Sequence, residues 1–548
     1  MRVLLRYLMI LPLCGIAVTN AVAQQVACPL RPTPGTPVTN PFDLYSQNGT
    51  LTVNLSLQAS LGADGIQHYC YVYMTNGKAV EAPTLRLNPG DQLVLNLTNK
   101  LGGAQGPQRK TRGISPFSPM AGMHDMTMMA GTSGPADNCN GYPTTPTSTN
   151  IHFHGMNIPP TCHQDEVINT VIPPGSPPFQ YNTQIPANDE GGLYWYHPHP
   201  HGFTSPQVNG GAAGALIIEG NNPLAQDLPE RVLVVRQQFA TPVGDEGPSQ
   251  LTLNFQPAIY PNAPSPIVYM QQGQQEYWRV LNATGETFLA LQLWFGTNQQ
   301  QLEVLEQDGI PLQSPMYSDT LVVPPAGRVE FVTPGLPAGQ TGTFLTDGFD
   351  SGTVGDPQPY QILADVEPSQ QLIGARINTH HAPDTGVIPR FSGLRGKPAT
   401  TQRLIYFSEQ TVGTNGPFQF YVTVNGQKPH MYRTSDAPAV VTHVGAIEDW
   451  TIENRSGEAH AFHMHQIHFL VEALNGVPVE NPYLLDTVTV PNWKGTGPYP
   501  SVTLRMDFSD PNIAGTFLFH CHILDHEDGG MMQRIVVLPS SGSSSATP

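Results

Sequence analysis

The sequence predicts an all-β fold built from consecutive Greek-key β-sandwiches. Composition is the first reason, because 55 prolines and 53 glycines with only 12% charged residues are typical of many short strands joined by turns. The second reason is a series of strand-like apolar segments, at 92–97, 231–235, 449–454 and 516–519. The third is that no long segment shows the apolar period of an amphipathic helix. We therefore expect repeated β-sandwiches of packed sheets.

The first 23 residues are predicted to be a secretory signal and not part of the fold. Arg2 and Arg6 precede an apolar run over 7–18, and the small residues 21–23 form a cleavage pattern. The mature chain would then begin at Gln24 and be exported, to the periplasm or the medium. No other apolar run approaches the roughly 20 residues that span a bilayer, so we expect no membrane span.

The length of 548 residues exceeds what a single core accommodates and predicts two to four domains. We place the first domain at 24–224, where it ends after the strand-like segment 215–219. The middle domain, 225–398, has no His-x-His pair and is expected to act as a spacer without metal. The last domain covers 399–539, and the serine-rich end, 540–548, is expected to be disordered.

A methionine-rich insertion interrupts the first domain between the strand-like segment 92–97 and residue 152. Its methionines and one histidine are Met120, Met123, His124, Met126, Met128 and Met129. Thioethers select Cu(I), so a copper-collecting role for the stretch 120–129 is one interpretation. A loop whose methionines have no function is the alternative.

Ten of the 19 histidines fall into four tight clusters, and each cluster contains a His-x-His pair. The clustered histidines are His152, His154, His197, His199, His460, His463, His465, His520, His522 and His526. On a strand, such a pair places two imidazoles on one face about 7 Å apart along the backbone. A single pair is often accidental, but four pairs together supply eight ligands, which suit three metal ions with open positions between them.

The last cluster also carries a thiolate and a thioether. One Cys, two His and a weak axial Met form a blue-copper site, and Cys521, His526 and Met531 supply three of these ligands, with His460 as the fourth. Side chains alternate across a strand, so the residues on either side of Cys521 would face away from its sulfur. They would bind a separate metal group.

In all four motifs the sequence resembles the multicopper oxidases, the family of laccases, ascorbate oxidase and bacterial cuprous oxidases. The resemblance implies three consecutive cupredoxin-like domains and four copper ions, one of type 1, one of type 2 and two of type 3. It implies that His152 and His463 hold the type 2 ion. The type 3 pair would be held by His154, His197, His199, His465, His520 and His522. The three ions would form a trinuclear cluster between the first and last domains.

The resemblance also implies a route for electrons and protons. A donor would give single electrons near His526, and Cys521 would pass them to its neighbours, where four electrons reduce O2 to two waters. Asp165 and Glu527 match the positions of carboxylates that assist proton transfer in the family, and the alternative is that both are surface acids. His201 is a candidate support for a metal-bound imidazole. Four other histidines are expected to bind no metal, namely His163, His380, His381 and His468.

Cysteine usage agrees with export. Once Cys14 leaves with the signal and Cys521 is reserved for copper, an even number remains, as Cys28, Cys70, Cys139 and Cys162. Two disulfides are plausible, and all three pairings stay open. The net charge of −18 becomes −20 when Arg2 and Arg6 are removed from the 24 basic residues that oppose 42 acidic ones. Such a surface disfavours nucleic acid and favours cations or neutral molecules.

Three functions follow from these observations. The leading one is a laccase-type oxidase of phenols or aromatic amines that uses O2 as acceptor. The second is an oxidase of Cu(I) or another metal ion in copper tolerance, which the methionine-rich stretch favours. The third is a copper-binding cupredoxin protein without turnover, and the complete set of ten histidines, Cys521 and Met531 argues against it.

Overall fold

The structure is a computed structural model, and it describes nine stretches of the chain. They are residues 27–62, 65–102, 138–141, 143–220, 222–239, 249–259, 261–382, 387–411 and 418–540. The predicted signal, 1–23, and the methionine-rich stretch, 120–129, lie outside the described residues. So do positions 541–548 of the predicted disordered end.

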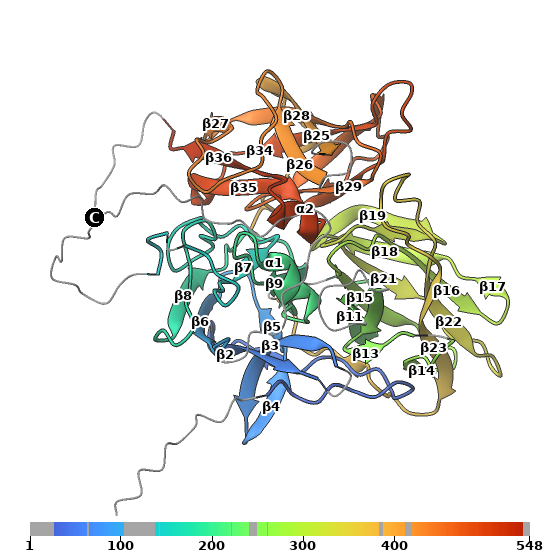
Figure 1. Cartoon of the computed structure of the whole chain (residues 1–548). Helices are drawn as coiled ribbons and strands as arrows, with labels where there is room; N and C mark the ends of the chain where they lie inside the picture. The colour runs from blue at the N-terminus through green and yellow to red at the C-terminus, as the bar shows by residue number, and fades with distance from the viewer. Residues whose placement is uncertain are drawn as a thin grey trace, which may run out of the picture.

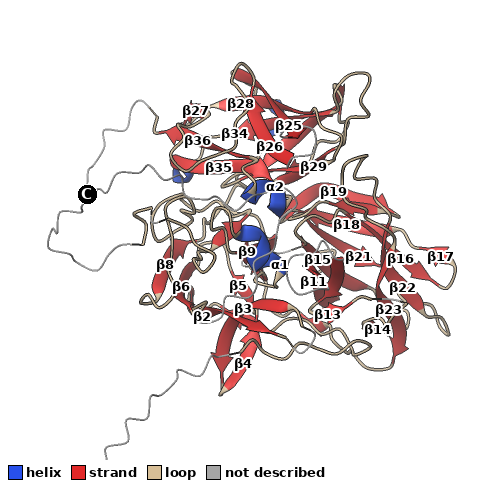
Figure 2. Cartoon of the chain, in the orientation of Figure 1, coloured by secondary structure: helices blue, strands red, loops and turns tan. Residues whose placement is uncertain are grey.

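The predicted all-β fold is confirmed. Strands dominate the described chain, and the α-helices there are α1 (Thr204–Asn209) and α2 (Leu524–Asp528), with short 3-10 turns at Leu394–Gly396 and Pro511–Ile513. Figure 2 shows these short helices among the strands. Neither the length nor the apolar character of any described helix is sufficient for a membrane crossing.

Two five-stranded sheets form the N-terminal part of the fold. One has the order β1 (Asp43–Tyr45), β5 (Thr84–Leu87), β10 (Gly214–Ile218), β9 (Gly192–His197) and β7 (His152–His154). The other has the order β4 (Lys78–Glu81), β3 (Gln67–Thr75), β2 (Thr50–Leu61), β6 (Gln92–Asn99) and β8 (Phe179–Gln184). In β6 every second residue is buried, as its alternating sequence predicts. Apolar side chains of both sheets meet in one buried cluster.

The middle part also consists of two sheets around their own core. The larger has the order β13 (Gln256–Pro257), β12 (Ser249–Leu253), β11 (Pro229–Phe239), β15 (Glu276–Ala283), β21 (Arg328–Thr333), β18 (Leu302–Gln307) and β19 (Ile310–Ser318), with β24 (Arg376–Ile377) beside β11. The smaller has the order β14 (Ile267–Gln271), β23 (Gln361–Ser369), β22 (Gly342–Asp347), β16 (Leu289–Phe295) and β17 (Asn298–Gln299), with β20 (Leu321–Val323) beside β16.

The C-terminal part repeats this two-sheet plan around a third core. Its larger sheet has the order β26 (Phe418–Val424), β25 (Thr401–Thr411), β28 (Ile447–Asn454), β34 (Ser501–Asp507), β30 (Phe469–Leu474) and β31 (Val477–Pro478), with β32 (Leu484–Leu485) beside β30. Its smaller sheet has the order β27 (Val440–His443), β36 (Met532–Leu538), β35 (Gly515–Cys521), β29 (His460–Met464) and β33 (Thr487–Val490). The four strand-like segments of the sequence all lie in strands, namely β6, β11, β28 and β35.

The three parts pack against one another closely. β9 and β10 of the first part share a buried apolar cluster with β11 and β15 of the middle part. α1 and α2 lie side by side where the first and last parts meet (Figure 1). There the Asp528 carboxylate accepts hydrogen bonds from the backbone N–H groups of Thr204 and Ser205, at 3.0 and 2.8 Å. The helix α2, which carries His526, is therefore tied to the first part of the chain.

We propose that each pair of sheets is one domain, with boundaries near 224 and 398. Both positions lie between strands, since β10 ends at Ile218 before β11 begins at Pro229, and β24 ends at Ile377 before β25 begins at Thr401. The N-terminal segment departs from this division in one respect. Val38 is buried in the core of the middle sheets, so the segment before β1 packs against them.

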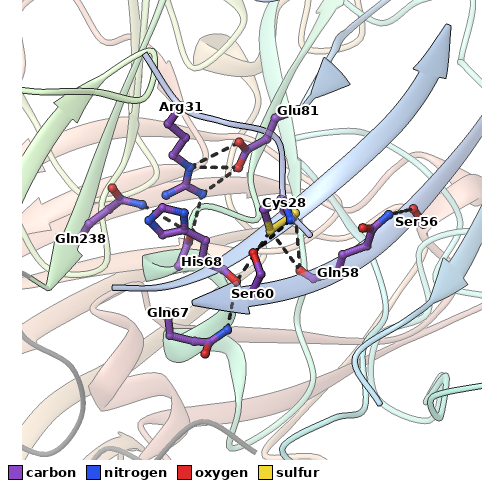
Figure 3. The surroundings of a disulfide bond; sticks show 11 residues. Cys28, Arg31, Ser56, Gln58, Ser60, Gln67, His68, Glu81 and Gln238 are labelled. Carbon is purple, nitrogen blue, oxygen red and sulfur yellow. Dashed lines mark hydrogen bonds and ion pairs between the residues drawn. A yellow bond between two sulfur atoms is a disulfide. The ribbon is translucent and has the colours of Figure 1, made fainter. Parts of the chain in front are cut away.

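Two disulfides lie in the described chain, and they join Cys28 to Cys70 and Cys139 to Cys162. Of the three pairings that the sequence left open, this one places Cys28 against β3. Figure 3 shows the first disulfide, where the Cys28 backbone N–H donates to the Ser60 hydroxyl at 3.0 Å. Beside it, the Arg31 guanidinium binds the Glu81 carboxylate at 2.7 Å (Figure 3). The disulfide and the ion pair fix the N-terminal segment to the edge of the first part.

Removing the first disulfide should lower stability without affecting the metal site. The Cys28→Ala and Cys70→Ala double variant frees a loop of 42 residues, which the chain-entropy account values at about 4 kcal/mol. Calorimetry should show a lower melting transition, while the copper content of the folded sample stays at the wild-type level. Copper loss at a temperature where the variant is folded would contradict this prediction.

Candidate metal centre

The tripeptide at the end of β35 places its three side chains in different ligand groups. The Cys521 sulfur lies in one group with His460 and His526. The imidazoles of His520 and His522 lie in two other groups, on the opposite side of the strand. This separation is what the alternation of side chains along a strand predicts, so the local geometry expected from the sequence is present.

The sulfur-containing group is deeply buried. Cys521 Sγ lies 3.5 Å from His460 Nδ1 and 3.9 Å from His526 Nδ1. Met531 is fully buried in the same core. Its backbone N–H donates to the carbonyl of His526 at 2.8 Å, and its carbonyl accepts from the N–H of Cys521 at 3.1 Å. These bonds hold the backbone of Met531, the predicted axial ligand, next to Cys521 and His526.

The remaining eight clustered histidines form three groups between the first and last sheets, and two of these groups share His154. Within each group the ligand atoms lie within 4.8 Å of one another. The groups are His152, His154 and His463; His154, His197 and His522; and His199, His465 and His520. Strand pairing brings them together, because His152 lies opposite His197 in one sheet and His463 lies opposite His520 in the other.

The outer nitrogens of these imidazoles are held by the protein. Nδ1 of His197 contacts the carbonyl of Pro198 at 2.9 Å, and Nδ1 of His520 contacts that of Cys521 at 3.0 Å. The inner nitrogens of several rings have no hydrogen-bond partner, namely Nε2 of His152, His197 and His463 and Nδ1 of His154. Unpartnered buried nitrogens are costly unless they bind something. The residues present therefore fit a set of copper ions.

Burial keeps these imidazoles neutral. It lowers the pKa of His197 to about 3 and that of His520 to about 4. In both cases a hydrogen bond to a neighbouring backbone carbonyl raises the pKa, but burial outweighs it. Burial also raises the pKa of the Cys521 thiol, so a thiolate there requires a bound cation. Neutral imidazoles and a thiolate compensated by a cation are the forms that bind soft metal ions.

The two carboxylates singled out in the sequence lie against the histidines and not at the surface. Asp165 is 1% exposed, and its oxygens lie 3.0 Å from Nδ1 of His152. Glu527 is fully buried, and its oxygens lie 3.5 Å from Nε2 of His199 and 3.3 Å from Nδ1 of His520. Burial is the main cause that raises the pKa of both carboxyl groups. The alternative that they are surface acids is therefore wrong.

Asp486 and Arg328 belong to this site and have no signal in the sequence. Asp486 is a single acid before β33, and its carboxylate lies 3.1 Å from Nε2 of His154. Arg328 comes from the middle sheets and forms an ion pair with Asp486 at 2.6 Å. Burial alone would raise the pKa of Asp486, but Arg328 lowers it. Only the packing of the three parts brings these two side chains to the histidines.

The other histidines lie outside the ligand groups of the described chain. His201 stacks edge-on against Tyr432 at 5.2 Å between ring centroids, and no contact with a clustered histidine is seen. His468 is buried, with Nε2 at 2.8 Å from the carbonyl of Asp308. His163 contacts the carbonyl of Gln180, and His380 stacks on Tyr45.

His526 is the ligand of the sulfur-containing group that comes nearest to the surface. Its side chain is 7% exposed, and Nε2 lies 3.5 Å from the Glu458 carboxylate, which is 12% exposed. The ring of Phe420 stacks on the imidazole at 4.1 Å between centroids. Glu409 contacts Nε2 of His460 at 3.1 Å. This edge combines an aromatic face with acidic groups.

Comparison with known proteins agrees with this geometry. Two multicopper oxidase family models match residues 140–223 and 402–541. The chain is 24% identical over 407 residues to the multicopper oxidase mco of Staphylococcus aureus, covering 71% of this chain and 77% of that one. It is 26% identical over 435 residues to a laccase of Haloferax volcanii, covering 73% and 70%.

A solved structure shares the fold. It is a multicopper oxidase from Campylobacter jejuni described as a metallo-oxidase, with a TM-score of 0.63, 21% identity and coverage of 93% of this chain and 96% of that one. The expected three consecutive cupredoxin-like β-sandwiches are thereby confirmed. The motif matches and the buried histidine groups lead to the same conclusion: the chain belongs to the multicopper oxidase family, copper-dependent oxidoreductases that use O2.

Proposed function

We propose that the protein is a laccase-type oxidase that takes single electrons from phenols or aromatic amines and uses them to reduce O2. The observation that carries this proposal is the position of the tripeptide 520–522, whose central sulfur lies in one ligand group while its neighbours lie in two others. A path of a few covalent bonds therefore connects the sulfur-containing group with the cluster of eight histidines.

The ligands divide as the family resemblance implies. The type 1 ion would be held by His460, Cys521, His526 and Met531, and the type 2 ion by His152 and His463. The type 3 pair would be held by His154, His197, His199, His465, His520 and His522. Four bound copper ions would supply the redox chemistry, which oxidises four donors by one electron each and, with four protons, reduces one O2 to two waters.

Asp165 and Glu527 are the groups that we propose hold and deliver these protons. Each carboxyl group is buried and lies against a ligand histidine, and burial raises its pKa. A carboxyl group with a raised pKa takes up a proton more readily than an ordinary one and can pass it to a basic oxygen nearby. The two groups contact different histidines of the cluster, since one lies beside His152 and the other beside His199 and His520.

The edge of His526 is where the donor would bind. The Phe420 ring beside it offers an aromatic face, on which a phenol or aromatic amine stacks in an offset or edge-on arrangement. The Glu458 carboxyl group at 3.5 Å from Nε2 of His526 can form a hydrogen bond with the donor's hydroxyl or amino group. Together they favour a neutral donor that is both aromatic and polar.

Oxidation of Cu(I) in copper tolerance is the second candidate. Glu458 and Glu409 lie beside the two imidazoles nearest to the donor edge, and a carboxyl group binds a cation once it is ionised. The stretch 120–129 supplies thioethers, which prefer Cu(I). The Campylobacter jejuni relative, whose title describes a metallo-oxidase, supports the same possibility.

We also propose that the protein is exported. Disulfides form and persist mainly in oxidising compartments, and the pairs Cys28–Cys70 and Cys139–Cys162 are both formed. The predicted signal at 1–23 would direct the chain there. We propose O2 and a small-molecule donor as its partners.

Oxygen uptake with two reductants tests the substrate. With fully copper-loaded protein, we expect kcat/KM for a simple phenol to exceed that for Cu(I) by about tenfold or more. Burial raises the pKa of the Glu458 carboxyl group to about 9, so a cation must displace its proton to bind there. The Glu458→Gln variant keeps the size of the side chain and removes that ionisable group, so it should weaken Cu(I) oxidation more than phenol oxidation. Deletion of 120–129 should likewise weaken Cu(I) oxidation more than phenol oxidation. Faster turnover of Cu(I) would establish the second candidate, and no uptake with either reductant would overturn both.

A further inference from the structure

One arginine of the middle sheets reaches the histidine cluster, although the described residues of this part belong to no ligand group. Arg328 begins β21, and its side chain is fully buried. Nη1 donates to Oδ1 of Asp486 at 2.7 Å, and Nη2 donates to Oδ2 at 2.6 Å. This bidentate contact fixes both oxygens of the carboxylate in one plane with the guanidinium.

Asp486 in turn holds two ligand imidazoles. Its Oδ1 accepts from Nε2 of His154 at 3.1 Å, and its backbone carbonyl accepts from Nδ1 of His463 at 2.8 Å. A hydrogen on Nε2 of His154 leaves Nδ1 without a proton, and that nitrogen has no partner within the protein. Asp486 therefore selects which nitrogen of His154 is available to a metal, as outer carboxylates do for metal-bound histidines.

The guanidinium has no freedom to take another position. Its remaining N–H groups donate to the carbonyls of Leu193 at 3.1 Å, Asp308 at 2.8 Å and Ala326 at 3.2 Å. These carbonyls come from the first and middle parts of the chain, while Asp486 comes from the last. Through Arg328, contacts from all three parts of the chain hold the Asp486 carboxylate in one position relative to the histidines.

We infer that Arg328 is a positioning residue for the copper cluster and that the middle domain is more than a spacer. The inference rests on the proposed assignment of His154 and His463 as copper ligands. Arg328 orients the Asp486 carboxylate, and Asp486 orients the two imidazoles. A lysine cannot replace it, because an ammonium group is a point donor that cannot bind both carboxylate oxygens in one plane.

The simplest alternative is that the ion pair only stabilises the packing of the three parts. A matched arginine in the same sheets distinguishes this structural role from a positioning role. Arg231 lies in the same middle sheets, is fully buried and forms a bidentate pair with Glu276, with Nε at 2.5 Å and Nη2 at 3.0 Å from its oxygens. No ligand histidine contacts this pair. Arg231→Lys should therefore cause a similar loss of folding stability without changing the contacts of the histidine cluster.

The test compares Arg328→Lys with Arg231→Lys in the copper-loaded, full-length protein. Chelator competition followed by metal analysis should show about 10–100-fold weaker retention of copper at the histidine groups in Arg328→Lys. Electron paramagnetic resonance should show an altered type 2 signal in that variant. Its blue absorption should persist, because Arg328 has no contact with Cys521. Arg231→Lys should match the wild type in copper retention and in both spectra, even where its melting temperature falls.

Wild-type copper retention and an unchanged type 2 signal in Arg328→Lys would overturn the inference. Equal copper loss in both variants would also overturn it, since the effect would then follow from stability alone. If Arg328→Lys does not fold, Asp486→Asn gives the same readouts, because it removes the charge that the guanidinium binds and keeps the shape. A failure of the proposed function is distinct, because the wild-type protein itself would then bind no copper or consume no O2.

Discussion

The Cys521→Ser variant is expected to lose its blue absorption and nearly all oxygen uptake with a phenol. Serine offers a hard hydroxyl oxygen in place of the soft thiolate that copper prefers. Since loss of an outer partner of a ligand alone costs about 10–100-fold, loss of the thiolate should lower oxygen uptake by more than about 100-fold. Optical spectra and an oxygen electrode measure both effects on the same sample.

The histidine groups should remain loaded in this variant. Their imidazoles come from other positions, and the backbone of β35 that carries His520 does not depend on the sulfur. Metal analysis should therefore show the loss of one copper ion per chain. Met531→Leu is the matched control, because the axial thioether tunes the potential while the thiolate gives the colour. A blue, active Cys521→Ser sample would show that this sulfur is not the electron entry.

On acidification, the sulfur-containing site should release copper well before the histidine groups do. Metal binding to Cys521 displaces the thiol proton, whose pKa burial raises, so copper affinity there falls about tenfold for each unit of pH. His197 and His520 have lowered pKa values of about 3 and 4. They are therefore already neutral between pH 6.5 and about 4.5, and no proton competes with copper there.

The expected difference in copper affinity between buried and ordinary imidazoles is large. An imidazole with an ordinary pKa near 6.5 loses about 50-fold in copper affinity between pH 6.5 and 4.5, and several such ligands multiply the loss. Chelator competition across this range, with blue absorption and total copper followed separately, gives both curves. A synthetic peptide of residues 192–201 provides the comparison with ordinary pKa values. Release of copper from the histidine groups with a midpoint near pH 6.5 would show that burial does not protect them.

The sequence alone was sufficient for the fold class and for the local arrangement of side chains along each strand. Alternating burial in β6 and β28 follows the apolar pattern of their sequences, because the two faces of a strand alternate with every residue. The same rule separates the side chain of Cys521 from those of His520 and His522, which the structure places in different groups. Both inferences depend only on neighbours in the chain.

The tertiary structure decided the contacts between residues far apart in the chain. The disulfide between Cys28 and Cys70 is one of three pairings that spacing could not distinguish. The grouping of His199 with His465 and His520 requires the first and last sheets to face each other. The ion pair of Arg328 and Asp486 joins positions 158 residues apart. Chain periodicity carries no information about such pairs, because the packing of whole sheets sets their distances.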